Sequence, residues 1–93
     1  NNLSHTTKIE IETENLDQVK EALDFGVDII MLDNMDLDTM FEAVRMINGR
    51  AITEASGNIT LENINNVAAT GVDYISTSTI HSKAGIIDIG LDI

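Results

Sequence analysis

Ile30-Met31-Leu32-Asp33-Asn34-Met35 is the stretch that decides the fold of this 93-residue chain. An apolar run ends abruptly in an acid and an amide, and a helical pattern follows. A buried parallel strand delivers a carboxylate in this way to the rim of an α/β sheet, where such folds carry out their chemistry. We therefore expect Asp33 to stand at the carboxyl end of a strand, and we judge other polar residues by whether they reach the same rim.

An internal repeat extends this pattern along the chain. Residues 15–30 are echoed 45 positions later by residues 60–75. In each copy a polar residue opens a helix, a Gly closes it, and Val-Asp-x-Ile begins a strand. The periodicity predicts strands near 8–13, 28–33, 50–55 and 72–77, helices near 16–25, 37–48 and 60–70, and a tail strand over 86–93.

The alternation of strands and helices places the chain in the α/β class. Repeated βα units predict a parallel sheet with crossovers of one hand. Four such units are about half of an eight-fold TIM-like barrel, so we expect residues 1–93 to be one partial barrel domain. Its edge strands have unpaired backbone groups, and we expect them to pair with a second copy of the chain or with the missing half of a barrel. Residues 1–7 resemble the join after an upstream helix, and we expect a fragment of a larger protein.

Composition excludes several classes of function. The net charge is −11, from 16 acids against five bases, and such a field repels nucleic acid and anionic membranes. The chain has no cysteine, which rules out a disulfide framework and thiolate metal sites. With no apolar run of membrane-spanning length, the expected location is cytoplasmic.

Glu12 and Asp33 are the carboxylates with the clearest chemical meaning. They are predicted to end neighbouring strands, which lie about 5 Å apart in a sheet. Two carboxylates at that separation suit a hard divalent ion such as Mg²⁺ carrying a polyphosphate, or the hydroxyls of a ribose. The alternative for Asp33 is an acid that caps the following helix.

Ser56-Gly57-Asn58 lies between a predicted strand and a predicted helix. Small residues there allow a ligand to approach the backbone, and the helix N-terminus adds free N–H groups and partial positive charge. The segment is therefore a candidate phosphate loop, or alternatively an ordinary strand-to-helix connection. Ser78 and His81, after the fourth strand, are further candidates for contact with a phosphate.

Together these segments resemble quinolinate phosphoribosyltransferase, the decarboxylating nicotinate-nucleotide pyrophosphorylase, in its C-terminal part. The resemblance spans nearly the whole chain. It is carried by Lys8-Ile9-Glu10-Ile11-Glu12, Ala22 to Asn34, Glu54-Ala55-Ser56-Gly57-Asn58-Ile59-Thr60-Leu61, Thr70-Gly71-Val72-Asp73-Tyr74-Ile75-Ser76 and Asp88-Ile89-Gly90-Leu91-Asp92-Ile93. It implies a glycosyltransferase of NAD biosynthesis that joins quinolinate to phosphoribosyl pyrophosphate with Mg²⁺, in an incomplete barrel that works as a dimer or larger homo-oligomer.

The resemblance also implies roles for single residues. Glu12 and Asp33 correspond to acids that hold the ribose hydroxyls and the metal, and Ser56, Gly57 and Asn58 to part of the 5′-phosphate site. An ungapped match puts Ser78 at a Gly of the family and shifts His81 by one position from the family's His. The bases that grip quinolinate lie upstream in the family, so we expect the chain alone to be inactive.

Two other readings stay open at this point. A phosphoacceptor domain of the receiver type also presents an Asp after an apolar strand, with Asp33 as the acceptor. The other reading is a catalytically inert half-barrel that associates with itself through its bare edges.

Overall fold

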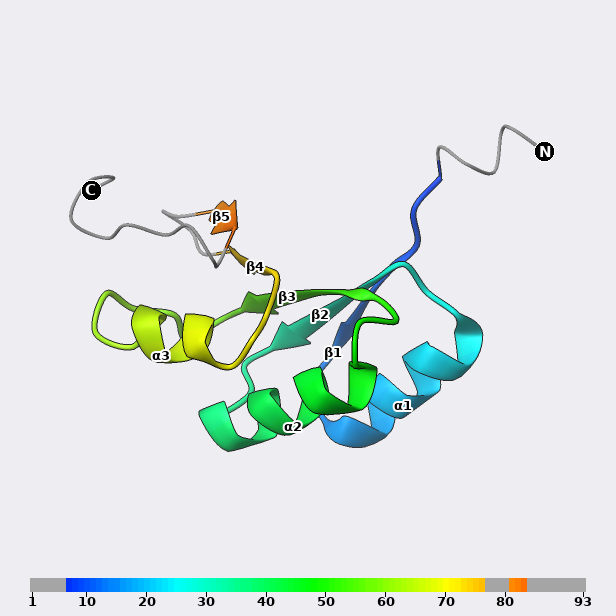
Figure 1. Ribbon diagram of the computed structural model, residues 1–93, viewed down its shortest axis with the longest axis horizontal. Coiled ribbons are helices and arrows are strands. Elements are labelled where there is room, and N and C mark those ends of the chain that lie inside the picture. Colours follow the sequence, from blue (N-terminus) through cyan, green and yellow to red (C-terminus); the bar gives the residue numbers. More distant parts are fainter. Residues whose placement is uncertain (1–6, 77–80, 84–93) are drawn as a thin grey trace.

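The computed structural model describes residues 7–76 and 81–83. Its elements alternate along the chain (Figure 1), in the order β1 (Glu10–Thr13), α1 (Leu16–Phe25), β2 (Ile29–Asp33), α2 (Leu37–Ile47), β3 (Ile52–Ser56), α3 (Ile64–Ala69), β4 (Tyr74–Ser76) and β5 (His81–Lys83).

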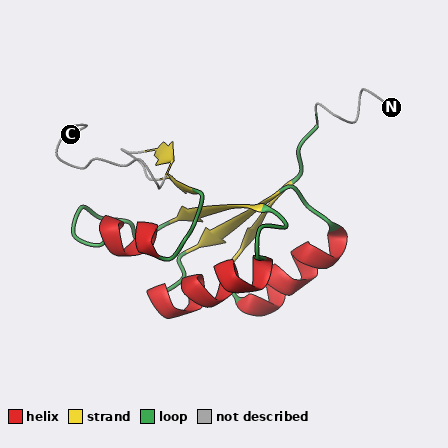
Figure 2. Ribbon diagram, in the orientation of Figure 1, coloured by secondary structure: helices red, strands yellow, loops and turns green. Residues whose placement is uncertain are grey.

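The strands form one sheet in the sequential order β1-β2-β3-β4-β5. The first four are parallel, and β5 runs antiparallel to β4. The three helices of the described part all lie on one face of the sheet (Figure 2). Sequential parallel strands with helices on a single face are the arrangement of a βα barrel, and the predicted parallel βα repeat is confirmed.

The helix ends follow the capping residues in the sequence. Before α1, the Asn15 side chain accepts a hydrogen bond of 2.9 Å from the Gln18 N–H, and Gly26 closes the helix at φ 72°. Before α2, the Asp36 side chain accepts from the Thr39 N–H at 2.8 Å, and Asn48 closes the helix at φ 49°. These caps satisfy backbone groups that a helix leaves unpaired, which explains why α1 and α2 begin where the sequence predicts.

The core lies between the sheet and the helices. Along β2, Ile30 and Leu32 are fully buried, whereas the alternate residues Ile29, Met31 and Asp33 are only partly buried on the other face. Strand side chains alternate between faces, so one face meets the helices, and the other, called the uncovered face below, has no helix over it in the described part of the chain. The covered face packs against the apolar sides of the helices, through Val19, Ala22, Met40, Ala43, Ile47, Ile64 and Val67.

The third helix is shorter than the predicted span 60–70. Regular helix begins at Ile64, because Thr60 and Asn63 close a turn on each other. The Thr60 N–H donates to Asn63 Oδ1 at 2.8 Å, and the Asn63 N–H donates to Thr60 Oγ1 at 3.2 Å. Such reciprocal bonds offer the backbone an alternative to helix.

Strand β5 was not expected from the sequence. Only four residues separate Ser76 from His81, whereas a parallel connection needs a dozen or more, so a strand this close can pair only in the antiparallel sense. Ser78 and the predicted tail strand 86–93 lie outside the described residues. For His81, only the backbone position in β5 is described.

The aspartate of each repeated Val-Asp pair bonds to the preceding strand at the amino end of the sheet. Asp28 joins β2 to the chain at the start of β1, and Asp73 joins β4 to β3. Asp28 Oδ2 accepts from the Ile9 N–H at 2.9 Å. Asp73 Oδ2 accepts from the Thr53 N–H at 2.9 Å and from the Thr53 hydroxyl at 3.2 Å, and that hydroxyl accepts from the Asp73 N–H at 2.9 Å. The aspartates of the repeat therefore stabilise the sheet at the end opposite the candidate site.

Asp73→Ala is expected to lower the free energy of unfolding by about 1–2 kcal/mol, since it leaves Thr53 without a charged acceptor. Asp24→Ala, which removes an exposed acid from α1, is the matched control and is expected to change it by less than about 0.5 kcal/mol. Urea unfolding at constant m-value measures both. Equal effects of the two substitutions would contradict this role of Asp73.

Candidate functional site

Three polar residues lie side by side at the carboxyl ends of β2, β3 and β4. The register pairs Asp33 with Ser56 and Ser56 with Ser76, and all three are partly buried on the uncovered face. The Asn34 N–H donates to the Ser56 carbonyl at 2.9 Å, which extends the ladder one step beyond Asp33. The parallel sheet thus brings an acid and two hydroxyls to one rim, where βα folds bind their ligands.

Glu12 lies on the same face but deeper than the rim. The register places it opposite Met31 rather than Asp33, so the two carboxylate-bearing residues are diagonal neighbours, with Cα atoms about 8 Å apart by strand geometry. The prediction that Glu12 and Asp33 lie directly opposite each other, about 5 Å apart, is therefore wrong. The cause of the offset is the register of β1 against β2, which is held by the bond from the Ile9 N–H to Asp28 Oδ2 at 2.9 Å and by the bond from the Thr13 hydroxyl to the Met31 carbonyl at 2.9 Å.

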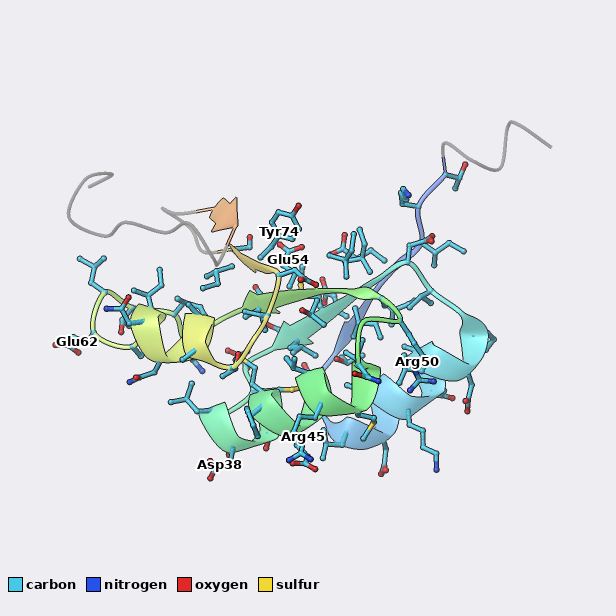
Figure 3. The ribbon with its side chains drawn as sticks, in the orientation of Figure 1. Asp38, Arg45, Arg50, Glu54, Glu62 and Tyr74 are labelled. Carbon is cyan, nitrogen blue, oxygen red and sulfur yellow. The ribbon has the colours of Figure 1, made fainter. Side chains whose placement is uncertain are left out.

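The same row across the uncovered face contains Glu12, Met31, Glu54 and Tyr74. Figure 3 shows Glu54 and Tyr74 on the side of the sheet opposite Asp38 and Arg45 of α2. Tyr74 remains 37% exposed there. The uncovered face therefore has a polar rim and, one row below it, a mixed row of acids and large side chains.

Gly57 approaches the end of β2 so closely that any side chain there would force Asn34 or Asp33 to move. A Cβ atom built on Gly57 would overlap the Asn34 carboxamide and lie 2.9 Å from Asp33 Oδ1. Gly57 has φ 79°, and its neighbours across and along the chain, Asn34 and Asn58, have φ 57° and 53°. Left-handed non-glycine residues are uncommon and gather at functional sites. The loop after β3 is thus packed directly against the candidate acid.

The loop around Gly57 does not lead straight into a helix N-terminus, contrary to the expectation for a phosphate cradle. The turn from Thr60 to Asn63 intervenes, and the Asn63 side chain makes no cap bond to α3. Instead its Nδ2 donates to the Asn58 carbonyl at 2.9 Å. The polar groups nearest to a ligand at this rim are therefore those of the Ser56–Asn58 loop itself.

A hollow of about 610 Å³ lies behind this loop, between the starts of α2 and α3. Asn34, Gly57 and Asn58 line it together with the apolar side chains of Met40 and Val67. Met40 and Val67 belong to the helix layer, so the hollow opens on the helix side. Asn34 and Gly57 line the hollow, and Asp33 does not.

The structure contradicts the capping alternative for Asp33. The acid that caps α2 is Asp36, three residues further on. Hydrogen bonds from the Thr39 backbone N–H and hydroxyl hold the pKa of the Asp36 carboxyl below its ordinary value of 3.8. Asp33 does not cap α2, and it lies at the rim beside Ser56.

Among the described residues, the side chains alone do not make a complete site for a resident metal. Within residues 7–76 and 81–83, no three His, Asp or Glu side chains are grouped so that they could hold an ion. Mg²⁺ is commonly bound by one or two carboxylates together with substrate phosphates. Asp33 and Glu12 fit that partial set, in which the substrate completes the coordination.

Two further residues, Ser76 and Asn34, are expected at the rim from the ends of their strands, although the sequence assigns neither of them a role there. Ser76 joins the row because β3 and β4 pair in register. Asn34 belongs to the site through its contact with Gly57. The sequence places both residues at strand ends but gives no sign that they touch.

The sequential parallel sheet, its single helical face and its polar carboxyl rim define a segment of a domain of the βα-barrel class. The phosphoacceptor alternative does not fit, because receiver domains are doubly wound with the strand order 2-1-3-4-5, and here the order is sequential.

Comparison with known proteins identifies the particular family. Residues 1–92 match the family described as quinolinate phosphoribosyl transferase, C-terminal domain, and the chain belongs to this family. A probable nicotinate-nucleotide pyrophosphorylase (carboxylating) from Synechocystis is 46% identical over 95 residues, which is 99% of this chain and 32% of the relative. A tobacco protein named quinolinate phosphoribosyltransferase (decarboxylating) 2b, mitochondrial, is 40% identical, over 91% of this chain and 28% of its own length.

Solved structures give the same result for the fold. The nicotinate-nucleotide pyrophosphorylase from Ehrlichia chaffeensis superposes with a TM-score of 0.76 and 40% identity, over 84% of this chain and 30% of that one. The enzyme of the same name from Francisella tularensis gives 0.74 and 38%, over 82% and 28%. The chain thus spans about a third of the length of these relatives. The expected family and the expected partial barrel are confirmed. None of the helices in the described part is long and apolar enough to cross a membrane.

Asp36→Ala is expected to lower the thermal midpoint at pH 7 by a few degrees, because α2 loses its N-terminal cap. A lowered pKa means that the contribution of Asp36 is complete above 3.8, its value in an unfolded chain, and is lost as the pH falls through the folded-state pKa below it. The difference between the two proteins should therefore shrink below pH 4. Asp38→Ala, in the first turn of the same helix, is the control. It should show a smaller effect, and a pH-independent difference for Asp36→Ala would argue against the cap.

Proposed function

We propose that residues 1–93 form the C-terminal part of the catalytic barrel of a quinolinate phosphoribosyltransferase. The reaction converts quinolinate and phosphoribosyl pyrophosphate to nicotinate mononucleotide, pyrophosphate and CO₂ in NAD biosynthesis. In a chain of this family, the observation that carries the proposal is the rim where Asp33 and Ser56 are register partners and Gly57 lies against both Asp33 and Asn34.

The acids act on the ribose. Departure of pyrophosphate leaves positive charge at the ribose carbon, and preorganised carboxylates stabilise such charge in the transition state. Asp33 at the rim and Glu12 one row below it are placed diagonally, so that a sugar ring lying across β1 and β2 meets both. Bound Mg²⁺, held by these carboxylates and the substrate oxygens, would neutralise the leaving pyrophosphate.

The loop Ser56–Asn58 is the proposed binding site of the 5′-phosphate. The Ser56 hydroxyl and the backbone at Gly57 lie beside the proposed ribose acids. A chain with net charge −11 repels phosphate at long range, so backbone N–H groups and hydroxyls have to provide this contact. Ser78 and His81 remain proposed phosphate ligands on the strength of the family resemblance.

Quinolinate itself needs bases from outside the described rim. Arg45 stacks on Phe41, with its guanidinium 5.7 Å from the ring centroid. Arg50 donates to the carbonyls of Met46 and Ile47 at 2.8 and 3.2 Å, at the end of α2. Both arginines are thus engaged on the helix side. We propose that a missing N-terminal half, or a second copy in a homo-oligomer, supplies the bases.

Cellular location stays a prediction. The tobacco relative is named mitochondrial and an Arabidopsis relative chloroplastic, whereas the Synechocystis name gives no compartment. We propose a cytoplasmic enzyme, which localisation of the tagged protein tests directly.

The test compares the chain alone with a chimera in which it replaces the matching 95 residues of the Synechocystis relative. The 93-residue chain alone is expected to form no nicotinate mononucleotide, because the bases for quinolinate are absent, whereas the chimera forms it. In the chimera, Asp33→Asn should lower kcat/KM by about 100- to 1,000-fold. Product formation followed by chromatography measures each rate.

Asp24→Asn, on the exposed side of α1, is the matched acid-to-amide control and should leave the rate within about twofold. Turnover by the chain alone, an inactive chimera of an active parent, or equal rates for Asp33→Asn and Asp24→Asn would each overturn the proposal.

A further inference from the structure

Asn34 occupies an unusual position at the end of β2. It is an exposed residue in the left-handed region, at φ 57°, a conformation that Asn tolerates better than most residues. Its N–H donates to the Ser56 carbonyl at 2.9 Å. Its carboxamide occupies the space where a Cβ on Gly57 would lie. The residue thus holds the loop after β3 through both its backbone and its side chain.

A second Asn and Gly with similar positive φ angles show what the left-handed conformation alone requires. Asn48 and Gly49, at the end of α2, have φ 49° and 80°. Nothing lies within 4 Å of a Cβ built on Gly49, whereas Gly57, at φ 79°, meets Asn34 and Asp33. The pair at the helix end serves as a cap. Asn34 and Gly57, at the ends of β2 and β3, differ from Asn48 and Gly49 because Asn34 lies where a side chain on Gly57 would be.

We propose that Asn34 is a positioning residue that fixes the Ser56–Asn58 loop relative to the Asp33 carboxylate. The inference rests on the proposed function, in which that loop receives the 5′-phosphate and Asp33 receives the ribose of one substrate. The distance between phosphate and sugar within that substrate is set by covalent bonds. A spacer of fixed size between the two protein contacts therefore lets both form without reorganisation.

The side chain at position 34 meets three separate requirements. It has to accept a positive φ, fill the gap above Gly57, and add no charge beside Asp33 and a phosphate. Gly meets the first and third but leaves the gap empty, and Asp meets the first and second but repels the phosphate. Ala is disfavoured at a positive φ. Asn meets all three.

The kinetic test uses the chimera with this chain in place of the matching part of the Synechocystis relative. Asn34→Gly should raise KM for phosphoribosyl pyrophosphate by about tenfold and leave KM for quinolinate within about twofold. Asn34→Asp should raise the first KM further, and more strongly at low ionic strength. Asn48→Gly, the control in the same conformation, should change neither. A purely structural role would lower the active fraction, and hence kcat, with both KM values unchanged, and that result would overturn the inference.

A double-mutant cycle tests the contact itself. Gly57→Ala should weaken binding of phosphoribosyl pyrophosphate much more than Gly49→Ala, which imposes the same backbone strain without a neighbour. Asn34→Gly should partly rescue Gly57→Ala, because it removes the group that the new methyl meets first. Simple additivity of the two effects contradicts the inference while leaving the proposed function intact. An inactive unsubstituted chimera contradicts the proposed function, and the inference falls with it.

Discussion

The parallel pairing of β2 with β3 is the constraint on which the rest of the structure depends. Its register makes Asp33 and Ser56 neighbours and ends with the bond from the Asn34 N–H to the Ser56 carbonyl. A slip of one residue would turn every side chain of β3 to the opposite face. Ala55 would then leave the core, and Ser56 would leave the rim. The same apolar contacts that stabilise the sheet therefore also select which hydroxyl stands beside the acid.

The two faces of the sheet have different requirements. The helix face is closed, with Ile30, Leu32 and Ile75 at 0% exposure, while Ile52 and Tyr74 on the other face remain 40% and 37% exposed. Parallel sheets are ordinarily covered on both faces, and the interior of a βα barrel is filled by side chains from all its strands. The half-exposed residues are of the kind that fill such an interior, which agrees with a chain that spans 32% of its Synechocystis relative.

Sequence reasoning succeeded where local chemistry decides the structure. Asn15 and Asp36 cap helices that begin where their patterns predict, and the alternation in β2 fixes which face is buried. It failed where a particular pattern of hydrogen bonds decides. The offset of Glu12 from Asp33 depends on the register of β1 against β2, and the late start of α3 depends on two hydrogen bonds between Thr60 and Asn63. Neither offset changes the hydrophobic periodicity, so neither is visible in it.

An acidic chain is compatible with the anionic substrates proposed for it, because acids and bases would act on different parts of the substrates. Acids at a site of phosphoribosyl transfer stabilise the cationic sugar of the transition state, and they weaken the binding of free anions. An enzyme gains rate from interactions that strengthen as the reaction proceeds, and uniform attraction to the substrate does not raise kcat. Under the proposed function, this segment contributes the carboxylates and the small-residue loop while the bases come from elsewhere, and its share of the site is then the part that favours the transition state over the ground state.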